Sequence, residues 1–138
     1  MKYNNFLTEF TDPENIYLLG YLWADGCIQK YGLSLEIKEE DFIEIEHIFI
    51  KYGINKFRIR QRMRDGKLFG KPQKSVYVSG KELASFLIEN DYHIKSQVSP
   101  TKILSKIPEE LKYYFWRGFF DGDGCFYYNQ KNFLRQFS

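Results

Sequence analysis

An internal repeat constrains this chain more than any other feature of its sequence. Residues 18–27 read LLGYLWADGC, and 98 positions later residues 116–125 read WRGFFDGDGC. Each copy has two small residues four positions apart, Gly20 and Ala24 in the first and Gly118 and Gly122 in the second. On a helix these residues share one face, so each copy predicts a helix with a smooth ridge. Two such ridges can pack closely, which would bring the following Asp25 and Asp123 to the same end of a helix pair.

Capping and turn signals predict the remaining elements of the chain. Asp12-Pro13-Glu14 starts the first motif helix, and Pro108-Glu109-Glu110 starts the second. Alternation of apolar and polar residues predicts one hairpin from residues 27–29 and 33–38, and another from 57–64 and 75–78. Helices are predicted at 41–52 and at about 83–90, the latter after a capping box at 79–82. Residues 91–106 are expected to form a connection or a short helix, residues 126–128 to begin a strand, and residues 132–138 to have no regular structure.

Arginine occupies every second position of the strand predicted at residues 57–64, so all four arginines would lie on one face. A solvated strand face usually mixes charge signs, whereas this stripe has no interleaved acid and favours a polyanionic partner. The net charge of +2 does not indicate such a partner by itself. Three lysines follow in a predicted loop, and the neighbouring hairpin has polar residues that could contact bases. The residues expected to contact DNA are Gln29, Ser34, Glu36, Lys38, Arg58, Arg60, Arg62, Arg64, Lys67, Lys71 and Lys74.

The paired aspartates predict metal-dependent hydrolysis of a phosphodiester. Two carboxylates at the ends of adjacent helices can hold Mg²⁺ or Mn²⁺, and a metal beside a phosphate can activate water and stabilise the leaving oxygen. A calcium loop beginning at Asp121 is excluded, because residues 125, 126 and 132 are Cys, Phe and Asn rather than the required types. With His47 and His93 as the only histidines, the sequence has no zinc cluster.

The two repeat copies resemble the paired signature motifs of the LAGLIDADG homing endonucleases. The first copy has Trp23 where that family often has aspartate, and the second has Asp121 there. The resemblance implies an α+β fold built as an αββαββα unit, in which a curved antiparallel sheet with helices on one face lies in the DNA major groove. It implies that Asp25 and Asp123 bind the metal and act in catalysis, and that Lys95 is the basic residue near the active site. Residues 1–106 would form a complete first repeat, and residues 107–138 the second motif helix and the start of an incomplete second repeat.

The leading expectation is therefore a site-specific double-stranded DNA endonuclease, of the kind associated with intron or intein mobility. One alternative is a DNA- or RNA-binding module without cleavage, either a degenerate endonuclease or an intron maturase. Another is a half-protein that forms a homodimer or complements a missing C-terminal half. Cys27 and Cys125 occupy equivalent repeat positions, which favours packing over a disulfide and hence an intracellular setting, in cytoplasm, nucleoid or organelle. The longest apolar run, residues 16–24, is far shorter than the roughly 20 residues of a membrane span, so no membrane partner is expected.

Overall fold

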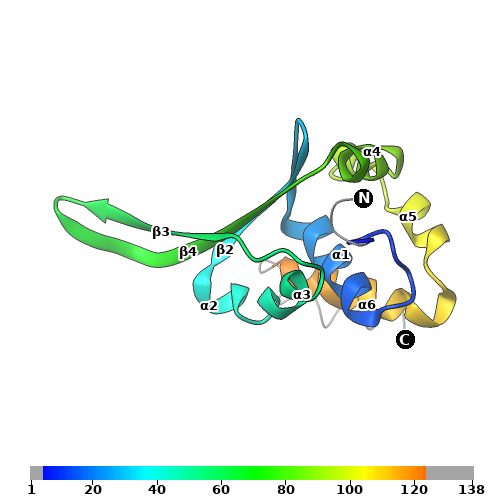
Figure 1. Cartoon of the computed structure of the whole chain (residues 1–138), viewed down its shortest axis with the longest axis horizontal. Coiled ribbons are helices and arrows are strands. Elements are labelled where there is room, and N and C mark those ends of the chain that lie inside the picture. Colours follow the sequence, from blue (N-terminus) through cyan, green and yellow to red (C-terminus); the bar gives the residue numbers. More distant parts are fainter. Residues whose placement is uncertain (1–4, 124–138) are drawn as a thin grey trace.

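The computed structural model describes residues 5–123, which form a mixed α+β fold (Figure 1). A four-stranded antiparallel sheet has the strand order β1-β2-β4-β3. Its strands are β1 (Cys27–Gln29), β2 (Gly32–Lys38), β3 (Phe57–Arg64) and β4 (Lys67–Ser79). The expected α+β class is confirmed. The elements predicted at residues 126–128 and 132–138 lie outside the described residues.

Two helices at the centre of the molecule carry the repeated motifs. They are α1 (Pro13–Asp25) and α6 (Lys112–Gly122), which contact each other more extensively than any other pair of elements. At the start of α1, an Asp12 carboxylate oxygen accepts a hydrogen bond of 3.1 Å from the Glu14 amide, and Pro13 follows the cap. The helix ends at Gly26, whose amide donates to the Leu22 carbonyl at 2.8 Å. Both ends lie where the local signals predict them.

The sheet contributes alternate side chains of β2 and β4 to the hydrophobic core. These side chains are buried with residues of α1 and of the helices that follow the sheet strands. The buried sheet residues are Leu33, Leu35, Ile37, Val76 and Val78. The other helices are α2 (Glu39–Phe42), α3 (Glu46–Lys51), α4 (Lys81–Glu89) and α5 (Thr101–Lys106), with 3-10 turns η1 (Tyr92–Ile94) and η2 (Glu109–Leu111). The β3–β4 hairpin extends beyond the helices, at the left of Figure 1. No helix within residues 5–123 is long and apolar enough to cross a membrane.

The helix predicted at residues 41–52 is wrong as a single element, because the chain forms α2 and α3 with a tight turn between them. The Ile45 amide donates to the Phe42 carbonyl at 3.0 Å, and the Ile48 amide donates to the Ile45 carbonyl at 3.1 Å. Such three-residue hydrogen bonds align side chains spaced by three positions. Phe42, Ile45 and Ile48 are all buried as a result, whereas Ile43 is exposed.

The loop predicted at residues 67–74 is also wrong, because β4 already begins at Lys67. Pairing with β3 extends the strand despite its glycine and proline, and a bulge lies opposite the segment between Arg60 and Arg62. Gly70 has a φ of +72°, and the Gln61 side-chain amide donates to the Phe69 and Gly70 carbonyls at 3.2 and 2.9 Å. The glycine and the side-chain hydrogen bonds accommodate the irregularity within the hairpin.

The capping box predicted at residues 79–82 does not form in the expected way. Ser79 pairs with Gly32 as the last residue of β4, so the N-cap of α4 is Gly80 and has no side-chain cap hydrogen bond. The Gly80 amide donates to the Tyr31 carbonyl at 2.7 Å. Ser79 therefore belongs to the sheet and not to the N-cap of α4, where the local sequence pattern placed it.

Candidate functional site

The seam between α1 and α6 brings two backbones into direct contact. A Cβ atom added at Gly20 would lie 1.9 Å from the Phe115 carbonyl oxygen, and one added at Gly118 would lie 1.9 Å from the Tyr17 carbonyl oxygen. At Gly122 the nearest atom would be the Tyr21 carbonyl oxygen at 2.7 Å, with the Ala24 Cβ at 3.2 Å. The four small residues of the repeats, Gly20, Ala24, Gly118 and Gly122, thus all lie at this seam.

The close approach of the two helices brings Asp25 and Asp123 to one cleft of about 420 Å³. Residues of α1, α2, α6, β2 and β4 line this cleft, together with Asp123. Three further carboxylates and one cation contribute to the lining, Glu36, Asp41, Asp121 and Lys38. The cleft therefore concentrates negative charge at the end of the helix pair.

Desolvation and neighbouring charges both act on the Asp25 carboxyl. Desolvation raises the pKa of the Asp25 carboxyl to about 6, while Lys95 lowers it and Asp123 and Asp41 raise it further. Repulsion from Asp123 means that the two motif aspartates act on each other through space. A cation bound between the two carboxylates would offset both the desolvation and the repulsion.

The carboxylate oxygens of Asp25 and Asp123 are of the type that binds Mg²⁺ or Mn²⁺. Among the residues described, no group of three or more His, Cys, Asp or Glu side chains is arranged to enclose a metal. Mg²⁺ commonly binds through only one or two carboxylates and takes its remaining ligands from water and substrate phosphates. The Asp25–Asp123 pair fits that mode of binding.

Lys95 lies at the C-terminal end of α1 and does not line the cleft. Its ammonium donates to the carbonyls of Trp23 at 2.8 Å and Gly26 at 2.6 Å, with the Leu22 carbonyl at 3.4 Å. Burial lowers the pKa of Lys95, whereas Cys27 and Asp25 raise it. Lysine near a helix C-terminus satisfies carbonyls that lack helical partners and opposes the negative end of the dipole. Lys95 therefore caps α1 and acts on Asp25 through its charge.

Lys95→Met is expected to lower the free energy of unfolding by about 3 kcal/mol, because half-buried carbonyls lose charge-assisted hydrogen bonds. Urea unfolding measures the change. Lys102→Met is the matched control, since the exposed Lys102 ammonium makes only a 3.4 Å ion pair with Asp91 and should contribute less than about 0.5 kcal/mol. Equal losses in the two variants would show that Lys95 is not a helix cap.

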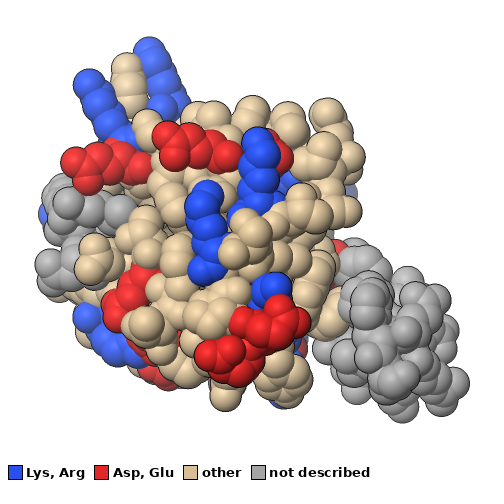
Figure 2. Space-filling model, turned by 90° about the vertical axis from the view of Figure 1, so that its right-hand side faces the viewer, with Lys and Arg blue, Asp and Glu red and all other residues tan. Residues whose placement is uncertain are grey.

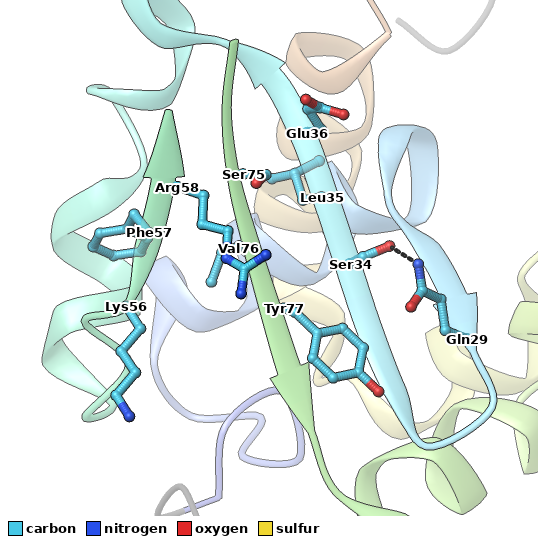
Figure 3. A pocket seen from close by; sticks show the side chains of 10 residues that line it. All are labelled: Gln29, Ser34, Leu35, Glu36, Lys56, Phe57, Arg58, Ser75, Val76 and Tyr77. Atoms are coloured by element: carbon cyan, nitrogen blue, oxygen red, sulfur yellow. Dashed lines mark hydrogen bonds between the residues drawn. The ribbon is translucent and has the colours of Figure 1, made fainter. Parts of the chain in front are cut away.

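The face of the sheet opposite the core carries a groove of about 620 Å³, lined by polar and apolar residues (Figure 3). Strand register aligns Ser34 with Tyr77, and Glu36 with Ser75, which in turn pairs with Arg58. Figure 3 shows Gln29 beside Ser34, joined to it by a hydrogen bond of 3.2 Å. Register also aligns Lys38, Gln73 and Arg60 on this face.

The arginine stripe continues along the extended hairpin. Beyond the bulge, Arg62 pairs with Phe69, and Arg64 pairs with Lys67. The Arg64 guanidinium lies 5.4 Å from the centre of the Phe69 ring. The expectation that no acid accompanies the stripe is wrong, since Glu36 makes an ion pair of 2.9 Å with Arg60.

Two predicted contact residues lie away from the groove. Register pairs Lys74 with Ile37 and Ile59, on the face opposite the arginines, and its ammonium forms an ion pair with Glu46. Lys71 forms an ion pair of 2.9 Å with Glu40. These lysines have local acidic partners, so they are weaker candidates for phosphate contacts than the arginines.

The groove also includes residues that sequence reasoning missed. Four polar residues lie at the groove or in register with its lining, Lys56, Gln73, Ser75 and Tyr77. Alternation of Gln73, Ser75 and Tyr77 with Lys74, Val76 and Val78 is the signal that could have found three of them. Elsewhere the charges are mixed: Figure 2 shows basic and acidic side chains interspersed over the described part of the end opposite the hairpin. The row of arginines on β3 contrasts with this mixed surface, with Glu36 as its acidic neighbour.

The chain was compared with protein-family models and with curated proteins. No protein-family model matches the chain. Among curated proteins, the chain is similar to the uncharacterized protein MJ0398 of Methanocaldococcus jannaschii, with 27% identity over 130 residues. The match covers 85% of this chain and 42% of that protein, so the chain spans less than half the length of this relative.

Proposed function

We propose that this chain is the DNA-binding and carboxylate-bearing part of a metal-dependent, site-specific endonuclease of the LAGLIDADG homing type. One observation carries the proposal. Glu36 lines both the cleft that contains Asp25 and Asp123 and the groove on the sheet face, so these two surfaces adjoin. A duplex lying along the arginine-bearing face would present its backbone to the carboxylates.

Each part of the surface has a role in this proposal. Arg58, Arg62 and Arg64 would contact phosphates, and the polar side chains between the strands would face base edges in the major groove. Asp25 and Asp123 would hold Mg²⁺ or Mn²⁺ against the scissile phosphate. The bound ion would supply an activated water and stabilise the leaving oxygen. Lys95 would maintain the end of α1 and limit the rise in the pKa of Asp25.

The proposal is tested with a pool of random-sequence DNA duplexes. The chain is expected to retain a subset of sequences, and these duplexes are expected to be cut when Mg²⁺ or Mn²⁺ is added. With EDTA present, binding should persist and cleavage should stop, because the arginine contacts do not need the metal. Retention without cleavage under either condition would instead support a binding module that does not cut. Failure to retain any duplex would reject both functions.

A further inference from the structure

Arg60 and Glu36 form an ion pair across the polar face of the sheet. The Arg60 Nη2 and Glu36 Oε2 atoms are 2.9 Å apart, and the side chains are 63% and 36% exposed. They come from β3 and β2, with β4 between the two strands. Of the arginines on β3, Arg60 is the one with an acidic partner within residues 5–123. The pair therefore lies, with both side chains accessible, on the surface proposed to face DNA.

Glu36 places a negative charge on the sheet face that is proposed to bind DNA. Glu36 is the acidic member of the described groove lining, and a negative charge facing a DNA backbone weakens binding. A carboxylate can contribute to recognition if it accepts a hydrogen bond from a base. Its ion pair also limits the motion of the arginine, so less side-chain freedom is lost on binding.

The pattern of donors and acceptors selects one kind of base pair. Arg60 retains guanidinium N–H groups that do not face Glu36, and Glu36 retains its second oxygen. In the major groove, a G·C pair presents two adjacent acceptors, guanine N7 and O6, followed by the N4 donor of cytosine. An A·T pair presents an acceptor, a donor and an acceptor in that order. Two donors from arginine next to one acceptor from glutamate therefore match G·C and mismatch A·T.

We propose that the Arg60–Glu36 pair reads a single G·C base pair, with Arg60 donating to guanine and Glu36 accepting from cytosine N4. This inference rests on the proposed function, because it assumes that the sheet face binds duplex DNA. Glu36 also lines the cleft of Asp25 and Asp123. The G·C pair that it reads therefore lies beside the site of cleavage rather than at the far end of the hairpin.

The probe for this inference is the same pool of random-sequence duplexes, bound to the full chain and then sequenced. The parent chain is expected to select G·C at one position by about 5- to 150-fold over A·T. Glu36→Gln replaces one acceptor oxygen with an NH2 donor and removes the charge that pairs with Arg60, and Arg60→Lys removes the planar fork. Each variant should therefore lose most of that preference at the same position. Preferences at the other positions should remain. Glu40→Gln is the matched control, since Glu40 makes an exposed ion pair of the same length with Lys71 outside the groove.

The outcomes separate this inference from the proposed function. If the parent retains no duplex, the proposed function fails and the inference fails with it. If the parent selects sequences but Glu36→Gln and Arg60→Lys keep its full profile, the base-reading role alone is overturned. Loss of preference at an A·T position, or an equal change in Glu40→Gln, would also overturn it. Glu36→Gln and Arg60→Lys both alter exposed side chains, and thermal unfolding should confirm that the two variants fold like the parent.

Discussion

Asp25→Asn is expected to lower the rate of Mg²⁺-dependent DNA cleavage by at least about 100-fold while leaving DNA binding in EDTA unchanged. The substitution keeps the size of the side chain and removes one of the two charges that would hold the metal. A metal at a phosphate supplies several kcal/mol of charge stabilisation, and each 1.36 kcal/mol corresponds to a tenfold change in rate. Single-turnover cleavage of a selected duplex measures the effect.

The same substitution is also expected to raise the free energy of unfolding at neutral pH. Desolvation raises the pKa of Asp25 to about 6 in the folded protein, from 3.8 for an ordinary aspartate. The folded state therefore favours the protonated form, and ionisation destabilises it progressively as the pH rises from about 4 to about 6. Asp25→Asn removes this loss, so the variant should be more stable than the parent at pH 7, and the difference should shrink towards pH 4. Urea unfolding across this pH range, with EDTA present, measures it.

A variant that cleaves more slowly and yet is more stable at pH 7 has not lost cleavage by unfolding. Asp121→Asn is the control, because Asp121 also lines the cleft but accepts a 2.5 Å hydrogen bond from Tyr17 and lies 3.6 Å from the Arg117 guanidinium. It should retain cleavage within about tenfold of the parent. Adding Mg²⁺ should stabilise the parent and not Asp25→Asn. Cleavage by Asp25→Asn at the parent's rate would remove this residue from the proposed site.

Gly118→Ala is expected to lower the free energy of unfolding by about 3 kcal/mol or more. The added Cβ would lie 1.9 Å from the Tyr17 carbonyl oxygen and 2.9 Å from the Tyr21 amide nitrogen. Both contacts are backbone atoms of α1, so relief requires the helices to move apart. Overpacking typically costs 1–3 kcal/mol, whereas the same substitution in an unobstructed helix would stabilise by roughly 0.5–1 kcal/mol. The sign of the change therefore tests the seam directly.

Gly80→Ala provides the comparison for this prediction. Gly80 has extended backbone geometry, and an added Cβ would meet only the Leu83 Cβ, at an ordinary distance of 3.8 Å. Its change in stability should stay within about 1 kcal/mol of the parent. Urea unfolding of both variants and of Gly20→Ala measures the effect. A stabilised Gly118→Ala variant would contradict the direct contact between α1 and α6.

Local sequence signals predicted much of the fold. Asp12, Pro13 and Gly26 mark the ends of α1, and alternation of side chains locates β2 and β3, because caps and strand periodicity depend on residues close together in the chain. Two of the errors, at Ser79 and at residues 67–74, have a common origin in long-range pairing. Ser79 pairs in the sheet instead of capping a helix, and residues 67–74 form a strand because β3 lies beside them.

The repeat by itself determined that two glycine-ridged helices would end in aspartates, since spacing along a helix fixes which residues share a face. Only the tertiary structure decided which groups surround those aspartates. Lys95 reaches the Gly26 carbonyl across 69 positions, and Arg60 reaches Glu36 across 24. Lys74 forms an ion pair with Glu46 on the other face of the sheet. Strand order, register and the bulge at Gly70 determine these neighbours, and each depends on chain segments that no local pattern brings together.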